Sequence, residues 1–332
     1  MSSHDIAEKA IKFRKPARMP YNFPVIGRGD FACVKYAAPM TRISDIEKVD
    51  EWGCVWKKWG VNSDIIGEPM GHPLQRWENL RNYQWPTPKG LNRYKPVKEG
   101  LEGAADKFTA ASIEGILRRA RFIRGFSNLM EDFYLHPEKV KELVDNILSY
   151  CLEALENYSR FNGIHCIQLP EDWGTQAQPF MSVSMFREFF KPVYKKLFDA
   201  IHSYGWVIRM HSDGKINDLI EEFIDCGLDL IELEQPRALG IEEIGRRYRG
   251  RICFEGCIDI QATLPTNNKE LIKQEAKALI ENWGTPDSGF LGVCYHDPDI
   301  DLSDETIKTA FDAFQQYDIW KDTARQSAKA CT

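Results

Sequence analysis

The chain of 332 residues has no apolar run near the roughly 18 residues that a membrane-spanning helix needs. Its first twenty residues, MSSHDIAEKAIKFRKPARMP, are charged and have no apolar stretch of the signal-peptide kind. No basic stripe stands out either, because 43 Lys and Arg are mixed with 49 Asp and Glu for a net charge of −6. These absences argue against a membrane, secreted or nucleic-acid-binding protein, and we expect a cytoplasmic one.

Several short motifs are also missing. There is no C-x-x-C pair, so a zinc ribbon or a thioredoxin-like site has no support. The nine cysteines are an odd number and do not suggest a disulfide framework. No G-x-G-x-x-G or G-x-x-x-x-G-K-[ST] loop is present, which removes the usual signals of nucleotide binding.

The second half of the chain contains a regular alternation of predicted strands and helices. A helix is predicted from Pro137, because apolar residues recur at helical spacing over 140–155. Further helices are expected at 185–205 with a break at Pro192, and at 216–227, 241–250, 269–284 and 305–317. Strands are expected at 164–172, 206–214, 228–235, 251–259 and 289–297.

Strands and helices that alternate with short connections favour a parallel sheet. His211, Glu234 and Cys257 follow one another at intervals of 23 residues, which suits successive compact βα units. We therefore predict an α/β fold, a (β/α)8 TIM barrel, over a doubly wound open sheet. Its earlier strands are expected within 20–26, 54–66 and 107–115.

The whole chain, 1–332, is predicted to be one barrel domain. Residues 1–105 are rich in Trp, Pro and Gly, and are expected to be an irregular, loop-rich segment over the barrel mouth. The regular βα units follow at 106–318, and a tail at 319–332.

Ionisable side chains gather where the predicted strands end, which is where barrel enzymes build their sites. Residues two apart on a strand share a face, so two ionisable side chains at that spacing near a strand end point the same way. The residues concerned are Glu171 and Asp172, His211 and Asp213, Glu232 and Glu234, Glu255 and Cys257, and Cys294, Tyr295 and His296. A set of His, Cys and carboxylate side chains at one mouth has the ligand types that zinc prefers. His211 and Cys294 are the centre of this predicted site, whereas Cys253, deeper in its strand, is expected to pack in the core.

The chain also resembles a known superfamily. EDWGTQ (171–176), the long run that ends in WVIRMHSDG (206–214), CGLDLIELEQ (226–235), RICFEGCIDIQ (251–261) and GFLGVCYHDPD (289–299) resemble uroporphyrinogen decarboxylase and its relatives. WGCVW and HPLQRWENL extend the resemblance into the N-terminal half. The resemblance implies a (β/α)8 barrel, in agreement with the periodicity.

Two branches of that superfamily lead to different functions. The decarboxylases carry an Arg-rich loop that binds substrate carboxylates, whereas the corresponding stretch here, 19–31, keeps only Arg28. The chain is more similar to the corrinoid-dependent methyltransferases, which include methylcobamide:coenzyme M methyltransferases and O-demethylase components. Their His-x-Cys…Cys zinc pattern is matched by His211 and Cys294, departs at Asp213, and is accompanied here by an added Cys257.

The resemblance implies bound Zn²⁺ with His211, Cys294, Cys257 and Glu234 as candidate ligands, the third ligand being open among Asp213, Glu234 and Cys257. A carboxylate in place of a thiolate makes the site harder and suits an oxygen ligand. We therefore expect methyl transfer from a methoxylated, aromatic-ether substrate to the Co(I) corrinoid (cobalamin) of a partner protein. Glu171, Asp172, Asp213 and Tyr295 are the predicted catalytic residues, with a carboxylate orienting a hydroxyl beside the methoxy group.

Three other functions remain open at this stage. One is a metal-independent decarboxylase of a smaller acid, with Asp172 or Asp213 as the proton donor. A second is a thiol-directed corrinoid methyltransferase, and a third is a binding protein that keeps the barrel. The density of ionisable strand-end residues disfavours the third. The oligomeric state is also open, a homo-oligomer included.

Overall fold

The computed structural model describes residues 1–57, 69–294 and 302–321. Its main sheet has nine strands in the order β2-β1-β12-β11-β10-β9-β8-β7-β3. All neighbouring pairs in that order are parallel except β1 with β2, which is antiparallel. Within the described residues, none of the helices has the length and apolar character that crossing a bilayer requires.

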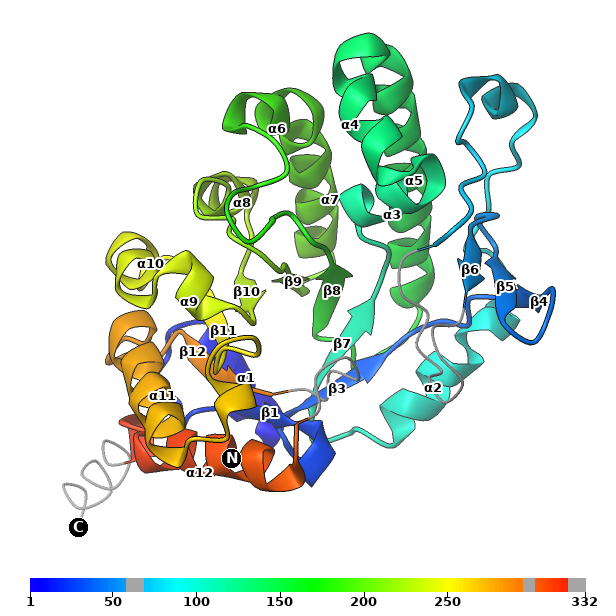
Figure 1. Ribbon diagram of the computed structural model, residues 1–332. Helices are drawn as coiled ribbons and strands as arrows, with labels where there is room; N and C mark the ends of the chain where they lie inside the picture. The colour runs from blue at the N-terminus through cyan, green and yellow to red at the C-terminus, as the bar shows by residue number, and fades with distance from the viewer. Residues whose placement is uncertain (58–68, 295–301, 322–332) are drawn as a thin grey trace.

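The strands of this sheet are short. They are β1 (Tyr21–Phe23), β2 (Arg28–Gly29), β3 (Phe31–Val34), β7 (Phe108–Ser112), β8 (Cys166–Pro170), β9 (Val207–His211), β10 (Leu230–Leu233), β11 (Cys253–Cys257) and β12 (Phe290–Val293). The helices are α1 (Ser3–Ile11), α2 (Lys95–Glu102), α3 (Ile116–Arg124), α4 (Phe126–Leu135), α5 (Pro137–Tyr158), α6 (Val183–Phe189), α7 (Lys191–Ser203), α8 (Ile220–Cys226), α9 (Pro236–Leu239), α10 (Ile241–Tyr248), α11 (Lys269–Trp283) and α12 (Asp304–Gln316). Figure 1 shows the strands curving around the middle of the molecule with the helices outside them. The predicted (β/α)8 barrel is therefore confirmed, as a nearly closed sheet with alternating helices.

The predicted helix boundaries follow from local chemistry. Pro137 occupies the first turn of α5, and Pro192 the first turn of α7, where the break after α6 was expected. Helix α8 ends at Gly227, whose φ of 106° is a left-handed conformation that glycine adopts without strain.

The N-terminal third differs from the expectation in two places. Residues 54–66 hold no barrel strand among their described residues: β6 (Val55–Lys57) pairs instead with β5 (Glu47–Asp50), which pairs with β4 (Met40–Arg42) in a separate antiparallel sheet. The second barrel strand of the chain is β3. The strand predicted within 54–66 was wrong for the described part, 54–57, because Trp56 of β6 packs edge to face on Phe122 of α3, with 5.0 Å between the ring centroids, and β6 stays outside the barrel sheet.

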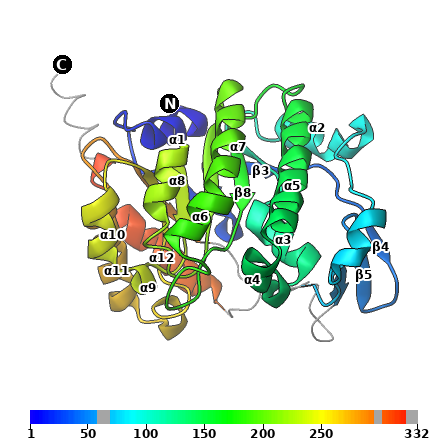
Figure 2. The same ribbon diagram turned by 90° about the horizontal axis from the view of Figure 1, so that it is seen from above.

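Helix α1 closes the end of the barrel where the strands begin. Its Ala7 and Ile11 pack against the first inward-facing side chains of six strands. Those are Phe108, Cys166, Val207, Leu230, Cys253 and Leu291. Figure 2 shows α1 at one end of the barrel and α4 and α9 toward the other. Cys253 is thus a core residue, as predicted.

The C-terminal part is more ordered than a tail from residue 319 would be. Trp320 is buried, and its Nε1 donates a hydrogen bond of 3.0 Å to the carbonyl of Thr285. The chain therefore stays packed on the barrel to at least this residue.

Candidate active site

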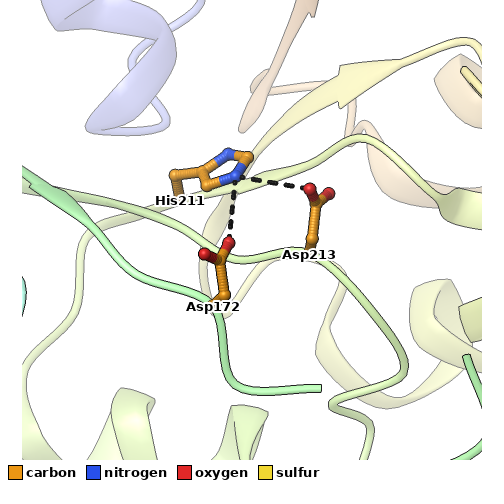
Figure 3. A group of neighbouring side chains, drawn as sticks. All are labelled: Asp172, His211 and Asp213. Atoms are coloured by element: carbon orange, nitrogen blue, oxygen red, sulfur yellow. Dashed lines mark ion pairs between the residues drawn. The ribbon is translucent and has the colours of Figure 1, made fainter. Parts of the chain in front are cut away.

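His211 is the last residue of β9, at the end of the barrel opposite α1. Its Nε2 lies 3.6 Å from Asp172 Oδ1 and 3.8 Å from Asp213 Oδ2. Figure 3 shows both carboxylates turned toward the same edge of the imidazole. The three side chains stay partly open to solvent, with 20–36% of each exposed. The structure thus brings together three of the residues that the sequence singled out.

The other ring nitrogen faces a different carboxylate. His211 Nδ1 lies 3.6 Å from Glu232 Oε2, and Glu232 is buried in β10. His211, Glu232 and Glu234 form a second close group of ligand-type atoms, which overlaps the first at His211. The imidazole therefore stands between an open pair of carboxylates and a buried one.

This acidic surrounding governs the protonation of the site. Burial lowers the pKa of His211, but the ion pairs with Asp172 and Glu232 and the charge of Asp213 outweigh it and hold that pKa well above its usual value. Burial raises the pKa of Asp172, but His211 and the nearby Arg118 and Arg121 lower it below its ordinary range. With no ion bound, the site therefore holds a cationic imidazolium between carboxylates.

The group of Asp172, His211 and Asp213 suits a divalent metal. A tetrahedral zinc ion with ligands at about 2.0–2.2 Å separates its ligand atoms by about 3.3–3.6 Å. The separations of Nε2 from the two carboxylates, 3.6 and 3.8 Å, are close to that value and longer than a direct hydrogen bond. Three protein ligands with solvent access are also the usual set of a catalytic zinc site.

Cys257 and Cys294 lie together on the neighbouring strand ends. The two thiols contact each other, and this contact, with burial, raises the pKa of Cys257 well above its usual value. The charges of Glu234 and Glu232 add to that shift, so Cys257 lies near the acidic side of the mouth. Neither cysteine belongs to the two groups around His211 in the described part of the chain. The structure thus brings Cys257 to Cys294, but does not bring either into one group with His211.

The side chain of Glu171 holds the first turn of helix α3. It is fully buried, and its carboxylate accepts hydrogen bonds from the backbone N–H groups of Leu117 and Arg118 at 3.3 and 3.0 Å and from the Tyr194 hydroxyl. Gly115, just before α3, has no side chain that could cap the helix, so Glu171 satisfies those donors. A Cβ on Gly115 would lie 2.2 Å from the Pro170 carbonyl oxygen, which explains why glycine is needed there. Burial raises the pKa of Glu171 to about 7.

Tyr295 and His296 lie outside the described residues.

Two arginines that the sequence reading did not single out also belong to the site. Arg121 of α3 donates to the backbone carbonyl of Asp172 at 3.4 Å. Arg209 lies two residues before His211 on the same face of β9. An arginine inside the apolar strand WVIRMH was the signal that could have revealed it.

The comparisons with known proteins agree with this fold. The model of the uroporphyrinogen decarboxylase (URO-D) family matches residues 71–317. The chain belongs to this family. The strands β8 to β12, whose ends carry the site residues, all lie within the match. Membership of a family of enzymes supports an enzymatic function.

One curated relative and one solved structure are informative. Uroporphyrinogen decarboxylase 1, chloroplastic, from Oryza sativa subsp. japonica is 21% identical over 212 residues, which are 59% of this chain and 50% of that protein. The chain thus spans half the length of that URO-D relative. A methyltransferase from Methanosarcina mazei has the same fold, with a TM-score of 0.61 and 18% identity over 80% of this chain and 76% of that one.

Proposed function

We propose that this URO-D family member is a methyltransferase that takes the methyl group of a methoxylated aromatic substrate and transfers it to the Co(I) corrinoid of a partner protein. The observation that carries the proposal is the convergence of Asp172 and Asp213 on one nitrogen of His211, at separations suited to a metal. These three residues would hold Zn²⁺. Oxygen ligands make that site hard, and a hard site prefers an ether oxygen to a thiol.

The reaction balances as follows. The O–CH₃ bond breaks, and both of its electrons stay with the oxygen. The methyl carbon bonds to cobalt, which supplies the electron pair and is formally oxidised from Co(I) to Co(III). The oxygen takes one proton from solvent water, so the products are a phenol and methyl-Co(III) on the partner.

Zinc bound at His211 would act as a Lewis acid that stabilises negative charge on the leaving oxygen. The residues of the chain prepare that position. His211 has to release its Nε2 proton before this nitrogen can act as a ligand, while Nδ1 keeps a proton toward Glu232. Arg121 holds the backbone of Asp172, and Glu171 ties the adjoining segment to α3. Both contacts limit the movement of Asp172 relative to the ring.

A groove beside the site supports an aromatic substrate. Its volume is about 580 Å³, within the range of small-molecule sites. It is lined by aromatic and methionine side chains that include Phe126, Tyr134, Phe180 and Met185, and by Thr175 and Asp218 from the loops after Asp172 and Asp213. The guanidinium of Arg121 lies 5.6 Å from the Phe126 ring and 5.2 Å from the Phe180 ring, and so joins the groove to Asp172.

The test is a methyl-transfer assay with zinc-replete protein, a corrinoid protein reduced to Co(I) and a panel of methoxy-aromatic compounds. We expect the Co(I) absorbance to give way to that of methyl-Co(III) with at least one compound. His211→Ala should abolish the change. The control is His202→Ala, because His202 pairs with Asp229 outside the site. Zinc-replete protein that forms no methyl-cobalt with any compound would refute the proposal.

A metal-independent decarboxylase is the second candidate, and the protonation of His211 favours it. Loss of CO₂ leaves an electron pair on carbon, which must take up a proton. The imidazolium of His211, paired with Asp172 and Asp213, is a proton donor at the mouth of the barrel. Metal content separates the two functions, because this reaction would proceed in protein freed of zinc.

A further inference from the structure

A charged side chain crosses the interior of the barrel directly beneath His211. Arg209 is buried, and its guanidinium forms an ion pair of 3.0 Å with Glu232 and another with Glu255. It also donates a hydrogen bond of 2.9 Å to the side-chain oxygen of Gln168. Arg209, Glu232 and Glu255 come from the three adjacent strands β9, β10 and β11. A buried ionic group of this kind stabilises a fold weakly, because taking its charges out of water offsets their mutual attraction.

The carboxylate of Glu232 links this buried layer to the site. The oxygen that lies 3.0 Å from Arg209 is also the one that lies 3.6 Å from His211 Nδ1. Only 3% of the Glu232 side chain is exposed, so it is far less open to solvent than Asp172 or Asp213. Arg209, which also pairs with Glu255, therefore offsets part of the charge of Glu232 and holds the oxygen that faces the imidazole.

The two nitrogens of His211 thus meet carboxylates of two kinds. Nε2 faces the partly exposed Asp172 and Asp213, whereas Nδ1 faces Glu232. The two ring nitrogens point in different directions. Glu232 faces Nδ1, so it does not share an ion that is bound at Nε2. Glu232 Oε2 lies 3.6 Å from Nδ1, longer than a direct hydrogen bond, so the buried carboxylate acts on the ring through its charge, which favours a proton on Nδ1. A carboxylate at the second nitrogen of a ligating histidine commonly sets the tautomer and orientation of the ring.

We infer that Glu232, held by Arg209, is a positioning residue that keeps the proton of His211 on Nδ1 and directs Nε2 toward the ion. The inference rests on the proposed function, because it assumes zinc at Asp172, His211 and Asp213. It assigns the second group of ligand-type side chains to support of the ring, not to a second metal. It also explains why an arginine stands inside an otherwise apolar strand.

The experiment is a zinc titration against a chromophoric chelator, with wild type, Glu232→Gln and the control Asp132→Asn. Asp132 also forms a buried ion pair, with Arg124, but contacts none of the His211 group in the described contacts. We expect Glu232→Gln to weaken zinc binding by about 10–100-fold, and Asp132→Asn to leave it unchanged. A second readout is the ¹⁵N spectrum of histidine-labelled, zinc-loaded protein, in which the His211 signals should show a protonated Nδ1 in wild type and a tautomer mixture or weaker order in the variant.

The outcomes separate the inference from the proposed function. Wild type that binds no zinc at His211 overturns both. Wild type that binds zinc while Glu232→Gln binds it equally well overturns the inference alone. Should Glu232→Gln fail to fold, Glu232→Asp keeps the charge opposite Arg209 but withdraws the oxygen from Nδ1, and its zinc affinity must still fall. If the Asp132 control and the Glu232 variants lose zinc affinity equally, the loss comes from a general loosening of the fold, and the inference is overturned.

Discussion

His211 ends β9, Asp172 follows the neighbouring strand β8, which ends at Pro170, and Asp172 Oδ1 lies 3.6 Å from His211 Nε2. The carboxylate is too far for a direct hydrogen bond of ordinary length, and at the distance that two ligands of one ion adopt. Asp213 stands in the same relation to that nitrogen at 3.8 Å. The site is therefore built around the position that all three atoms face.

If the ion is held there, each of the three side chains is needed for it. We expect each of His211→Ala, Asp172→Asn and Asp213→Asn to weaken zinc binding. The loss of affinity should exceed the roughly 10–100-fold that follows from removing a supporting residue. Metal analysis after dialysis against a weak chelator measures the loss. Asp199→Asn, an exposed acid on the outer helix α7, is the matched control and should retain the wild-type metal content. Zinc that persists in all three site variants would place the ion elsewhere.

Cobalt substitution decides between the oxygen-rich set and the cysteines. Because Cys257 and Cys294 contact each other and neither joins the described groups at His211, we expect Co²⁺-loaded protein to lack strong sulfur-to-cobalt charge-transfer absorption. Cys294→Ala and Cys257→Ala should then keep their metal. An intense near-ultraviolet band that disappears in Cys294→Ala would instead show that the methyltransferase pattern of the sequence holds at Cys294.

The regular half of the fold could be predicted from the sequence, as could β1 within 20–26 and β7 within 107–115, but the barrel strand β3 could not. From residue 137 each strand is a short apolar run between amphipathic helices, so periodicity locates it. Strand β3 has only four residues and no such flanks, whereas the aromatic 54–57 stretch looked more like a buried strand. Both depend on contacts with distant parts of the chain, which periodicity does not report.

The candidate site was predicted only in part for a similar reason. Strand ends identified Asp172, His211 and Asp213, because side chains at the carboxyl ends of parallel strands meet. Local sequence could not tell that Glu171 turns back to the N-terminus of α3 while Asp172 turns to His211. Nor could it pair Arg209 with Glu232 and Glu255, since that layer exists only once three strands lie side by side.

Glu171 predicts how stability depends on pH. Its pKa is raised to about 7 in the folded protein, so the folded state binds a proton that the unfolded state has released above about pH 4.5. The resulting stabilisation is present below that pH and is lost as the pH rises through about 7, by on the order of 3 kcal/mol. Thermal denaturation between pH 5 and 8 measures it. Glu171→Gln, which mimics the protonated acid, should show a smaller slope, and a slope equal to that of wild type would contradict the assignment.

Gly115 predicts a local steric limit next to the site. In Gly115→Ala the new methyl group would lie 2.2 Å from the Pro170 carbonyl and 2.8 Å from the Glu171 carboxyl carbon, so the segment leading to Asp172 must shift. We expect a loss of about 2–4 kcal/mol in the free energy of unfolding, together with weaker zinc binding. Gly103→Ala is the control, since its Cβ would meet only ordinary contacts at 3.7 and 3.9 Å. Chemical denaturation of both variants provides the comparison, and equal stabilities would count against this packing.

A substitution in the groove beside α4 should affect substrate binding but not the chemical step. Phe180 lines the groove and stacks edge to face with Phe126, with 5.1 Å between the ring centroids. If the aromatic part of the substrate binds there, Phe180→Ala should raise KM about tenfold, in keeping with the loss of one aromatic contact, and change kcat little. Steady-state methyl transfer with a methoxy-aromatic compound measures both constants. Leu135→Ala is the control, because Leu135 is 66% exposed at the end of α4 and does not line the groove. Since Phe180 lies near Arg121 and not at His211, zinc content should be unaffected, and a variant that loses zinc or only kcat would remove the groove from the substrate site.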